Sequence, residues 1–148
     1  MAEYIITETE DFYPLSVLFH ENGVGISITD RAPEKIVKMW RMDDPQTDTL
    51  LAASTLEVRD GVYTLGDIAV RGDLQGKGYG KVMQDVVFDE ARRLGVKELW
   101  VCAKEPTFYE HLGWEIVPWD EAPNVAVNCT ACGKRGTLCM PEIMRKML

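Results

Sequence analysis

A glycine-rich turn between a hydrophobic strand and a helix is the part of this sequence with the clearest chemical meaning. Gly76, Gly78 and Gly80 fall within five residues, after an apolar stretch and at the start of an amphipathic one. Glycine lets consecutive backbone N–H groups point into one hollow, and the amino end of a helix adds partial positive charge. Lys77 and Lys81 bring further positive charge to the same turn. The turn therefore predicts a site for the phosphates of an anionic cofactor.

Two common nucleotide-binding loops do not fit this spacing. A P-loop requires Ser or Thr after its Gly-Lys pair to hold magnesium, whereas Lys77 is followed by Gly78. A dinucleotide fingerprint requires Gly-x-Gly-x-x-Gly, and the third glycine here comes one residue too early. The pattern that remains is Gln-x-x-Gly-x-Gly, formed by Gln75, Gly78 and Gly80.

This pattern resembles the coenzyme A loop of the GNAT superfamily of N-acetyltransferases. A second match lies downstream, where residues 108–114 (Phe-Tyr-Glu-His-Leu-Gly-Trp) resemble the family's F-Y-E-x-x-G-[FW] segment. The specific motifs cover roughly residues 60–120, and the amino-terminal part agrees only in its order of elements. The resemblance implies an α+β fold with a mixed, largely antiparallel sheet of six or seven strands and helices on both faces. It also implies a splay between the fourth and fifth strands, where the cofactor enters.

The resemblance assigns the cofactor contacts residue by residue. Backbone donors in the turn would hold the diphosphate, with lysine charge nearby. The backbone of the fourth strand would bind the pantetheine arm and the thioester carbonyl. Glutamine stands where the family more often has arginine, and a neutral amide binds phosphate less strongly than a guanidinium does. The residues expected to bind acetyl-CoA are Ile68, Val70, Gln75, Gly76, Lys77, Gly78, Tyr79, Gly80 and Lys81.

Tyr109 stands at the position where the family has its general acid. A phenol with a pKa of about 10 is a workable proton donor to a thiolate whose thiol has a pKa of about 8.5. Phe108 and Leu112, four residues apart, supply the core-facing side of a short helix and leave Tyr109 free to face elsewhere. The alternative is an aromatic side chain that only packs beside Phe108.

The amine acceptor arrives mostly protonated, so a carboxylate or a chain of waters must take its proton. Asp67 alternates with Ile68 along the fourth strand, and it faces away from the core if Ile68 faces the core. Glu57 on the preceding strand is the second candidate. A solvent-facing carboxylate without a catalytic role remains the alternative for each, and the sequence does not choose between them.

The cysteines near the carboxyl end are not explained by the resemblance. Cys129 and Cys132 form a C-x-x-C turn, and Cys139 follows seven residues later. Three thiolates resemble part of a zinc ribbon, which needs a fourth ligand, for which Cys102, His111 and Glu142 are the candidates. Reactive or redox-paired thiols and inert thiols are the other two interpretations.

The hydrophobic patterning predicts the elements that position these residues. Strands are expected at 4–7, 35–40, 50–59, 62–70, 96–103, 114–118 and 142–148, with Asp60-Gly61 as a hairpin turn. Helices are expected after a cap at residues 9–11, over 80–94, and from Pro106 to just before Gly113. In the second helix Met83, Val87, Ala91 and Leu94 form the expected buried stripe.

The length and charge of the chain limit its domain organisation and its classes of partner. The 148 residues fit one domain, with the cysteines in an insert at about 124–140 between the last two strands. The formal net charge of −8 argues against a nucleic-acid binder and fits a cationic amine acceptor, although such charge also keeps a small domain soluble. No apolar run is long enough to span a membrane, and the chain begins without a signal-peptide pattern. A cytoplasmic protein without a membrane partner is expected.

The sequence predicts an N-acetyltransferase that transfers the acetyl group of acetyl-CoA directly to a primary amine in a ternary complex. The second interpretation is a non-catalytic acyl-CoA sensor, in which the cysteines respond to metal or oxidant. Small metabolites, aminoglycosides, polyamines and protein amino groups all remain open as acceptors. A homodimer is among the oligomeric states that the resemblance implies.

Overall fold

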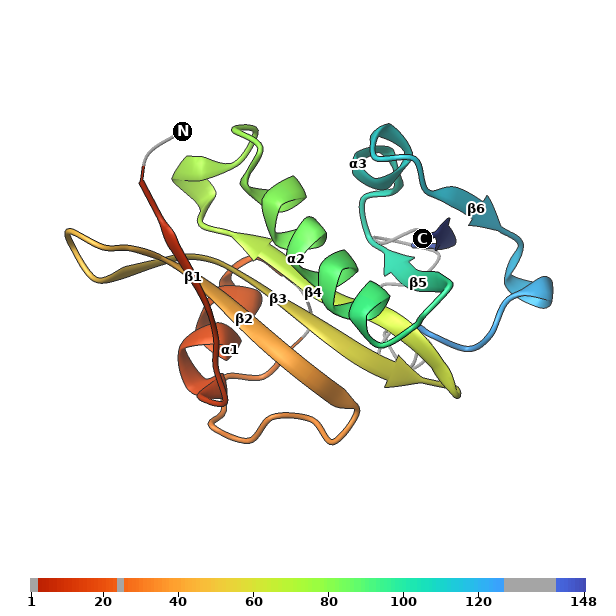
Figure 1. Ribbon diagram of the computed structural model, residues 1–148, viewed down its shortest axis with the longest axis horizontal. Helices are drawn as coiled ribbons and strands as arrows, with labels where there is room; N and C mark the ends of the chain where they lie inside the picture. The colour runs from red at the N-terminus through yellow and green to blue at the C-terminus, as the bar shows by residue number, and fades with distance from the viewer. Residues whose placement is uncertain (1–2, 24–25, 127–140) are drawn as a thin grey trace.

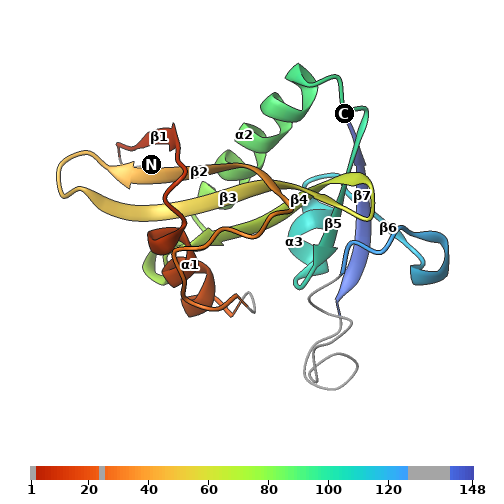
Figure 2. The same cartoon turned by 90° about the horizontal axis from the view of Figure 1, so that it is seen from below.

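A seven-stranded sheet with helices on both faces forms the centre of the molecule (Figure 1). The computed structural model describes residues 3–23, 26–126 and 141–148. The strands follow the order β1-β2-β3-β4-β5-β7-β6, and helices α1 and α2 lie on opposite faces (Figure 2). The strands are β1 (Ile5–Glu8), β2 (Ile36–Asp44), β3 (Thr49–Arg59), β4 (Val62–Val70), β5 (Glu98–Ala103), β6 (Glu115–Val117) and β7 (Glu142–Met147). The helices are α1 (Phe12–Glu21), α2 (Tyr79–Arg93) and α3 (Pro106–His111), with short 3₁₀ turns η1 (Gly72–Leu74) and η2 (Trp119–Glu121).

Strands β4 and β5 form the single parallel pair among the described strands, and they touch at one end only. Their ladder consists of one pair of partners, Thr64 and Trp100. Beyond it the two strands diverge, whereas β3–β4 and β5–β7 pair along most of their lengths. The expected fold and the expected splay are confirmed.

The hairpin between β3 and β4 has the predicted turn and one irregularity that sequence patterning does not show. Asp60 and Gly61 have φ values of 50° and 75°, as a two-residue turn with left-handed positions requires. Further along, Ser54 pairs with Ile68 while Leu56 pairs with Leu65, so that Gly66 and Asp67 together oppose Thr55. This β-bulge turns the strand locally and re-aims the side chain of Asp67.

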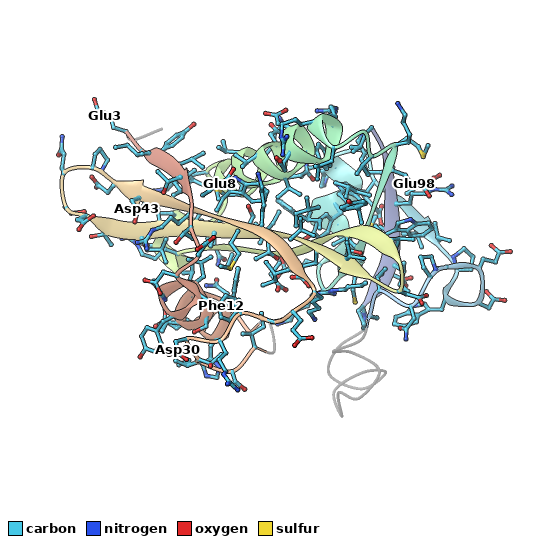
Figure 3. The ribbon with its side chains drawn as sticks, turned by 60° about the horizontal axis from the view of Figure 1, so that its bottom comes forward. Glu3, Glu8, Phe12, Asp30, Asp43 and Glu98 are labelled. Carbon is cyan, nitrogen blue, oxygen red and sulfur yellow. The ribbon has the colours of Figure 1, made fainter. Side chains whose placement is uncertain are left out.

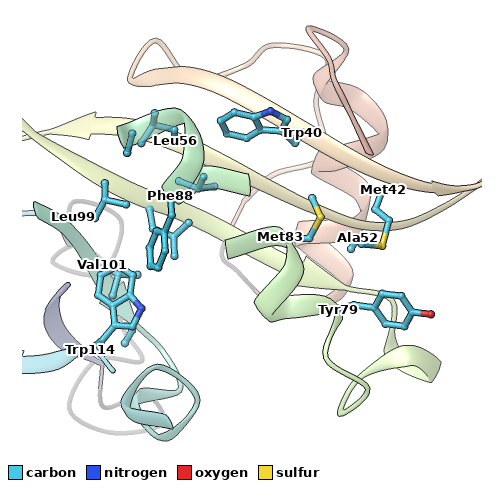
Figure 4. Packing of buried hydrophobic residues seen from close by; sticks show 14 of the residues in the cluster. Trp40, Met42, Ala52, Leu56, Tyr79, Met83, Phe88, Leu99, Val101 and Trp114 are labelled. Carbon is cyan, nitrogen blue, oxygen red and sulfur yellow. The ribbon is translucent and has the colours of Figure 1, made fainter. Parts of the chain in front are cut away.

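The main core lies between the sheet and α2 (Figure 4). Met83 and Phe88 from α2 pack with Trp40 of β2, Leu99 of β5 and Trp114. A second cluster lies under α1, where Phe12, Leu15, Leu18 and Phe19 face the sheet. None of the helices in the described ranges is long and apolar enough to cross a lipid bilayer.

Two local expectations about the helices are wrong. Leu94 is 41% exposed rather than part of the buried stripe of α2. The helix ends at Arg93, Gly95 adopts a φ of 81°, and the N–H of Val96 donates to Ala91 O at 2.9 Å. The chain thus reverses over Gly95, and Val96 rather than Leu94 returns to the core.

At the start of α1, the Asp11 side chain makes no cap hydrogen bond. Instead, Thr9 Oγ1 accepts the Asp11 N–H at 3.0 Å.

Candidate active site

The glycine-rich turn presents unpaired backbone donors at the amino end of α2. Gly76 and Gly78 have φ values of 78° and 91°, which favour glycine and let the chain fold tightly before the helix. At the start of α2 the N–H of Val82 donates to Gly78 O at 3.3 Å, and no backbone acceptor among the described residues receives the N–H of Gly76, Gly78 or Gly80. The N–H groups of Gly76, Gly78 and Gly80 are thus available for an anion.

Gly80 lets the beginning of α2 approach α3 closely. A Cβ at this position would lie 3.1 Å from Phe108 Cζ, closer than ordinary van der Waals contact. The two segments that carry the family motifs therefore touch at this point. Trp114 strengthens the connection, because its indole N–H donates to Gln84 Oε1 of α2 at 2.8 Å.

Three of the other side chains predicted at the turn, those of Gln75, Tyr79 and Lys81, already have partners. The Gln75 amide donates to Asn22 Oδ1 at 2.8 Å and to Val70 O at 3.2 Å, which ties the turn to the end of α1 and to β4. Lys81 is paired with Asp85 at 2.8 Å on the helix surface. The Tyr79 ring is buried against Tyr4 in the core. Lys77 is exposed beside the turn.

The backbone positions expected to bind pantetheine lie on β4 next to the splay. The side chains of Ile68 and Val70 pack against the main core under α2. Asp67 projects to the other face, where it lines a pocket with Phe12 of α1. The alternation expected from the sequence therefore holds at this point of β4.

Glu57 of β3 lies in a buried polar cluster. It is fully buried, and its carboxylate accepts hydrogen bonds from Thr55 Oγ1 at 2.7 Å and Arg59 Nε at 3.0 Å. Lys35 Nζ lies 3.7 Å from the same carboxylate. Arg59 also donates to Val125 O at 2.8 Å. These partners hold the Glu57 carboxylate in one position under the bulge of β4.

Asp67 has the electrostatic properties of a general base. Burial, and after it the negative charge of Glu57, raise the pKa of its carboxyl to about 7, against the opposing effect of Arg59 and Lys35. The Asp67 N–H donates to Thr55 Oγ1 at 3.0 Å, which connects the bulge to the Glu57 cluster. A carboxyl that titrates near neutral pH can accept a proton and release it again.

Tyr109 lies on α3 between two aromatic rings. Its ring packs edge-on against Phe108, with centroids 5.0 Å apart, and against Trp114 at 5.6 Å. Burial raises the pKa of its hydroxyl, and the negative charge of Asp67 raises it further. The phenol is therefore protonated throughout the physiological range. Both functions left open by the sequence, packing and proton donation, are compatible with this position.

A pocket of about 250 Å³ lies on the α1 face of the sheet, next to Asp67. The loop between α1 and β2 forms much of its wall, on the side of the molecule marked by Phe12 and Asp30 in Figure 3. Sequence reasoning missed this wall, because no motif or periodicity marks residues 26–35. The lining residues are Phe12, Ile26, Ser27, Thr29, Arg31, Pro33, Lys35 and Asp67.

The three cysteines proposed as metal ligands, Cys129, Cys132 and Cys139, lie outside the described residues. Within the residues that are described, no group of three or more His, Cys, Asp or Glu side chains could hold a metal ion. The strands on either side of the segment, β6 and β7, are adjacent and antiparallel.

Comparison with known protein families identifies the family to which this chain belongs. The model of the acetyltransferase (GNAT) family matches residues 6–114. The chain belongs to the GNAT acetyltransferase family. Membership supports acyl transfer with acetyl-CoA as the donor. A search of curated proteins found no match.

Solved structures of GNAT proteins share the fold at low sequence identity. N-acetylglutamate synthase from Neisseria gonorrhoeae, complexed with coenzyme A and N-acetyl-glutamate, gives a TM-score of 0.75 at 18% identity, over 100% of this chain and 36% of that chain. A GNAT acetyltransferase from Staphylococcus aureus Mu50 gives a TM-score of 0.69 at 13% sequence identity, over 99% of both chains. The ribosomal-protein-S18-alanine N-acetyltransferase from Escherichia coli gives a TM-score of 0.61 at 16% sequence identity, over 98% of this chain and 94% of that chain. The chain thus spans about a third of the length of the synthase and nearly the whole length of the other two.

Proposed function

We propose that this GNAT protein is an N-acetyltransferase that moves the acetyl group of acetyl-CoA to a primary amine by direct attack in a ternary complex. The observation that carries the proposal is the position of Asp67, a carboxyl with a pKa of about 7 in a pocket beside β4. The glycine-rich turn would hold the diphosphate through the N–H groups of Gly76, Gly78 and Gly80, with Lys77 nearby.

The proton transfers follow from this arrangement. Asp67 in its charged form takes a proton from the ammonium group of the acceptor, and the neutral amine attacks the thioester carbonyl carbon. When the carbon–sulfur bond breaks, Tyr109 donates its proton to the departing thiolate of CoA, and the nitrogen of the new amide gives its surplus proton back to the Tyr109 phenolate. Glu57 is the other candidate base, and we assign it a supporting function because Thr55 and Arg59 already occupy its carboxylate.

The acceptor is not fixed by the family. The names of similar structures include a synthase of N-acetylglutamate and an acetyltransferase of a ribosomal-protein alanine. Amino acids and protein amino groups are therefore both represented among folds of this kind. The acceptor must be inferred from the pocket of this chain.

The test is CoA-thiol release from acetyl-CoA across a panel of amines, with acetylated products identified by mass. Calorimetry on the same sample measures acetyl-CoA binding, and elemental analysis measures bound zinc. Amine-dependent release with an acetylated product supports the enzyme. Binding of acetyl-CoA without thiol release from any amine would favour the sensor, with the cysteines as its responsive part.

A further inference from the structure

The pocket beside Asp67 has a charge opposite to that of the whole chain. The protein carries a formal net charge of −8, yet two cationic side chains, Arg31 and Lys35, line this pocket. Among the described residues, Asp67 is the single acidic one that lines it. Because its pKa is about 7, Asp67 is partly neutral at physiological pH. The local field therefore favours a negative group on the ligand.

The two cations differ in their partners. Lys35 is mostly buried, and its ammonium lies 3.7 Å from the Glu57 carboxylate, so its charge is largely engaged. The Arg31 guanidinium forms no ion pair or hydrogen bond with any residue in the described ranges. Its acidic neighbours in sequence, Asp30 and Glu34, do not line the pocket. Arg31 is thus a positive group that a ligand can use.

The segment that carries Arg31 is fixed to the rest of the protein. The N–H of Thr29 donates at 3.0 Å to Ser16 Oγ, which is fully buried on α1. The N–H of Arg31 then donates to Thr29 Oγ1 at 3.1 Å. At the other end of the segment, the N–H of Val58 donates to Lys35 O at 2.9 Å. The wall of the pocket is therefore held in place before a ligand binds.

We propose that the acceptor is a small amine that also carries a carboxylate, of the size of an amino acid. This inference rests on the proposed function. The acceptor's amino group would lie at Asp67 and its carboxylate at Arg31, which can bind a carboxylate through two parallel hydrogen bonds. The pocket volume of about 250 Å³ is below the roughly 300–1,000 Å³ of sites for drug-sized ligands. A polyamine or an aminoglycoside would bring further positive charge toward Arg31 and Lys35 and would be repelled.

Matched acceptor pairs test the carboxylate requirement. Thiol release is measured with a panel of amino acids, with the corresponding amino-acid amides, and with spermidine and a short peptide. The variant is Arg31→Gln, and the control is Arg92→Gln, which removes an exposed arginine from the last turn of α2 on the other face of the sheet. Calorimetry on CoA-loaded protein measures binding of the best amino acid without turnover.

We expect Arg31→Gln to lower kcat/KM for the amino acid about 10- to 100-fold, mainly through KM, as loss of a charge-assisted hydrogen bond predicts. Its activity with the amide and its KM for acetyl-CoA should match those of the control. Equal use of amino acids and amides, a preference for spermidine or the peptide, or unchanged kinetics in Arg31→Gln would overturn the carboxylate proposal and leave the acetyltransferase intact. Arg31-dependent binding of the amino acid without thiol release would support the carboxylate site and reject the transferase. Absence of both binding and release would overturn both.

Discussion

The carboxylate of Glu57 packs directly against the backbone of Gly66, so that a Cβ at position 66 would overlap Glu57 Oε2. This contact joins β3 to the bulge of β4 and brings the Glu57 charge next to Asp67. A glycine in a strand interior weakens the strand, and its presence here is explained by the close approach of another side chain. The contact also explains part of the raised pKa of Asp67.

Gly66→Ala should therefore impair both folding and transfer. The added methyl group must displace the Glu57 side chain from Thr55 and Arg59, which leaves a buried charge with fewer partners. We expect a loss of about 3 kcal/mol or more in unfolding free energy, measured by urea denaturation. Gly72→Ala is the control, since a Cβ there meets nothing within 4 Å. Equal stability of the two variants would contradict the described contact.

Asp67→Asn should raise the stability of the protein at pH 8. The carboxyl has a pKa of about 7 in the folded state, above its ordinary value, so the folded state holds a proton that the unfolded state loses between about pH 4 and 7. Stability is therefore lost as pH rises through this window, and the neutral amide avoids that loss. We expect a rise in Tm of about 2–4 °C at pH 8, the shift that about 1 kcal/mol produces in a domain of this size.

The control for this measurement is Asp73→Asn. Asp73 is exposed, and its hydrogen bonds from Arg71 lower its pKa, so its contribution to stability has the opposite sign. The gain in Asp67→Asn should disappear below about pH 4, where both forms are neutral. A gain that does not depend on pH would mean that the Asp67 charge is not its source.

Tyr109→Phe should lower kcat without unfolding the protein. The ring keeps its packing against Phe108 and Trp114, and only the proton donor is lost. We expect a decrease in kcat of about 10²-fold or more, measured by thiol release at saturating substrates, with an unchanged thermal transition. An unchanged kcat would assign Tyr109 to packing alone.

The sequence predicts the elements whose signals are local. The Asp60-Gly61 turn fixes the hairpin, and the bounds of β4 agree with the prediction at both ends. The glycine-rich turn begins α2 as expected. Leu94 was misplaced because helical periodicity does not say where the chain leaves the helix, and the helix ends at Arg93, one residue before the stripe is complete.

The candidate site is less accessible to sequence reasoning, because contacts between distant segments form it. The sequence leaves Asp67 and Glu57 as equivalent candidate bases, and only the bulge at Gly66 gives one a pocket and the other an ion-paired, buried position. The loop that places Arg31 at the pocket is fixed by the hydrogen bond from the Thr29 N–H to Ser16 Oγ, thirteen residues earlier in the chain. The metal site, the homodimer and the cytoplasmic location stay predictions.

The pH dependence of acetyl transfer tests the central claim most directly. For the wild-type protein, kcat/KM should rise with pH through an apparent pKa near 7, as Asp67 loses its proton and becomes able to accept one from the amine. In Asp67→Asn this ascending limb should vanish, and kcat/KM at pH 8 should fall about 10²- to 10⁴-fold. A limb near pH 7 that persists in Asp67→Asn, with kcat/KM close to wild type, would show that another group accepts the proton.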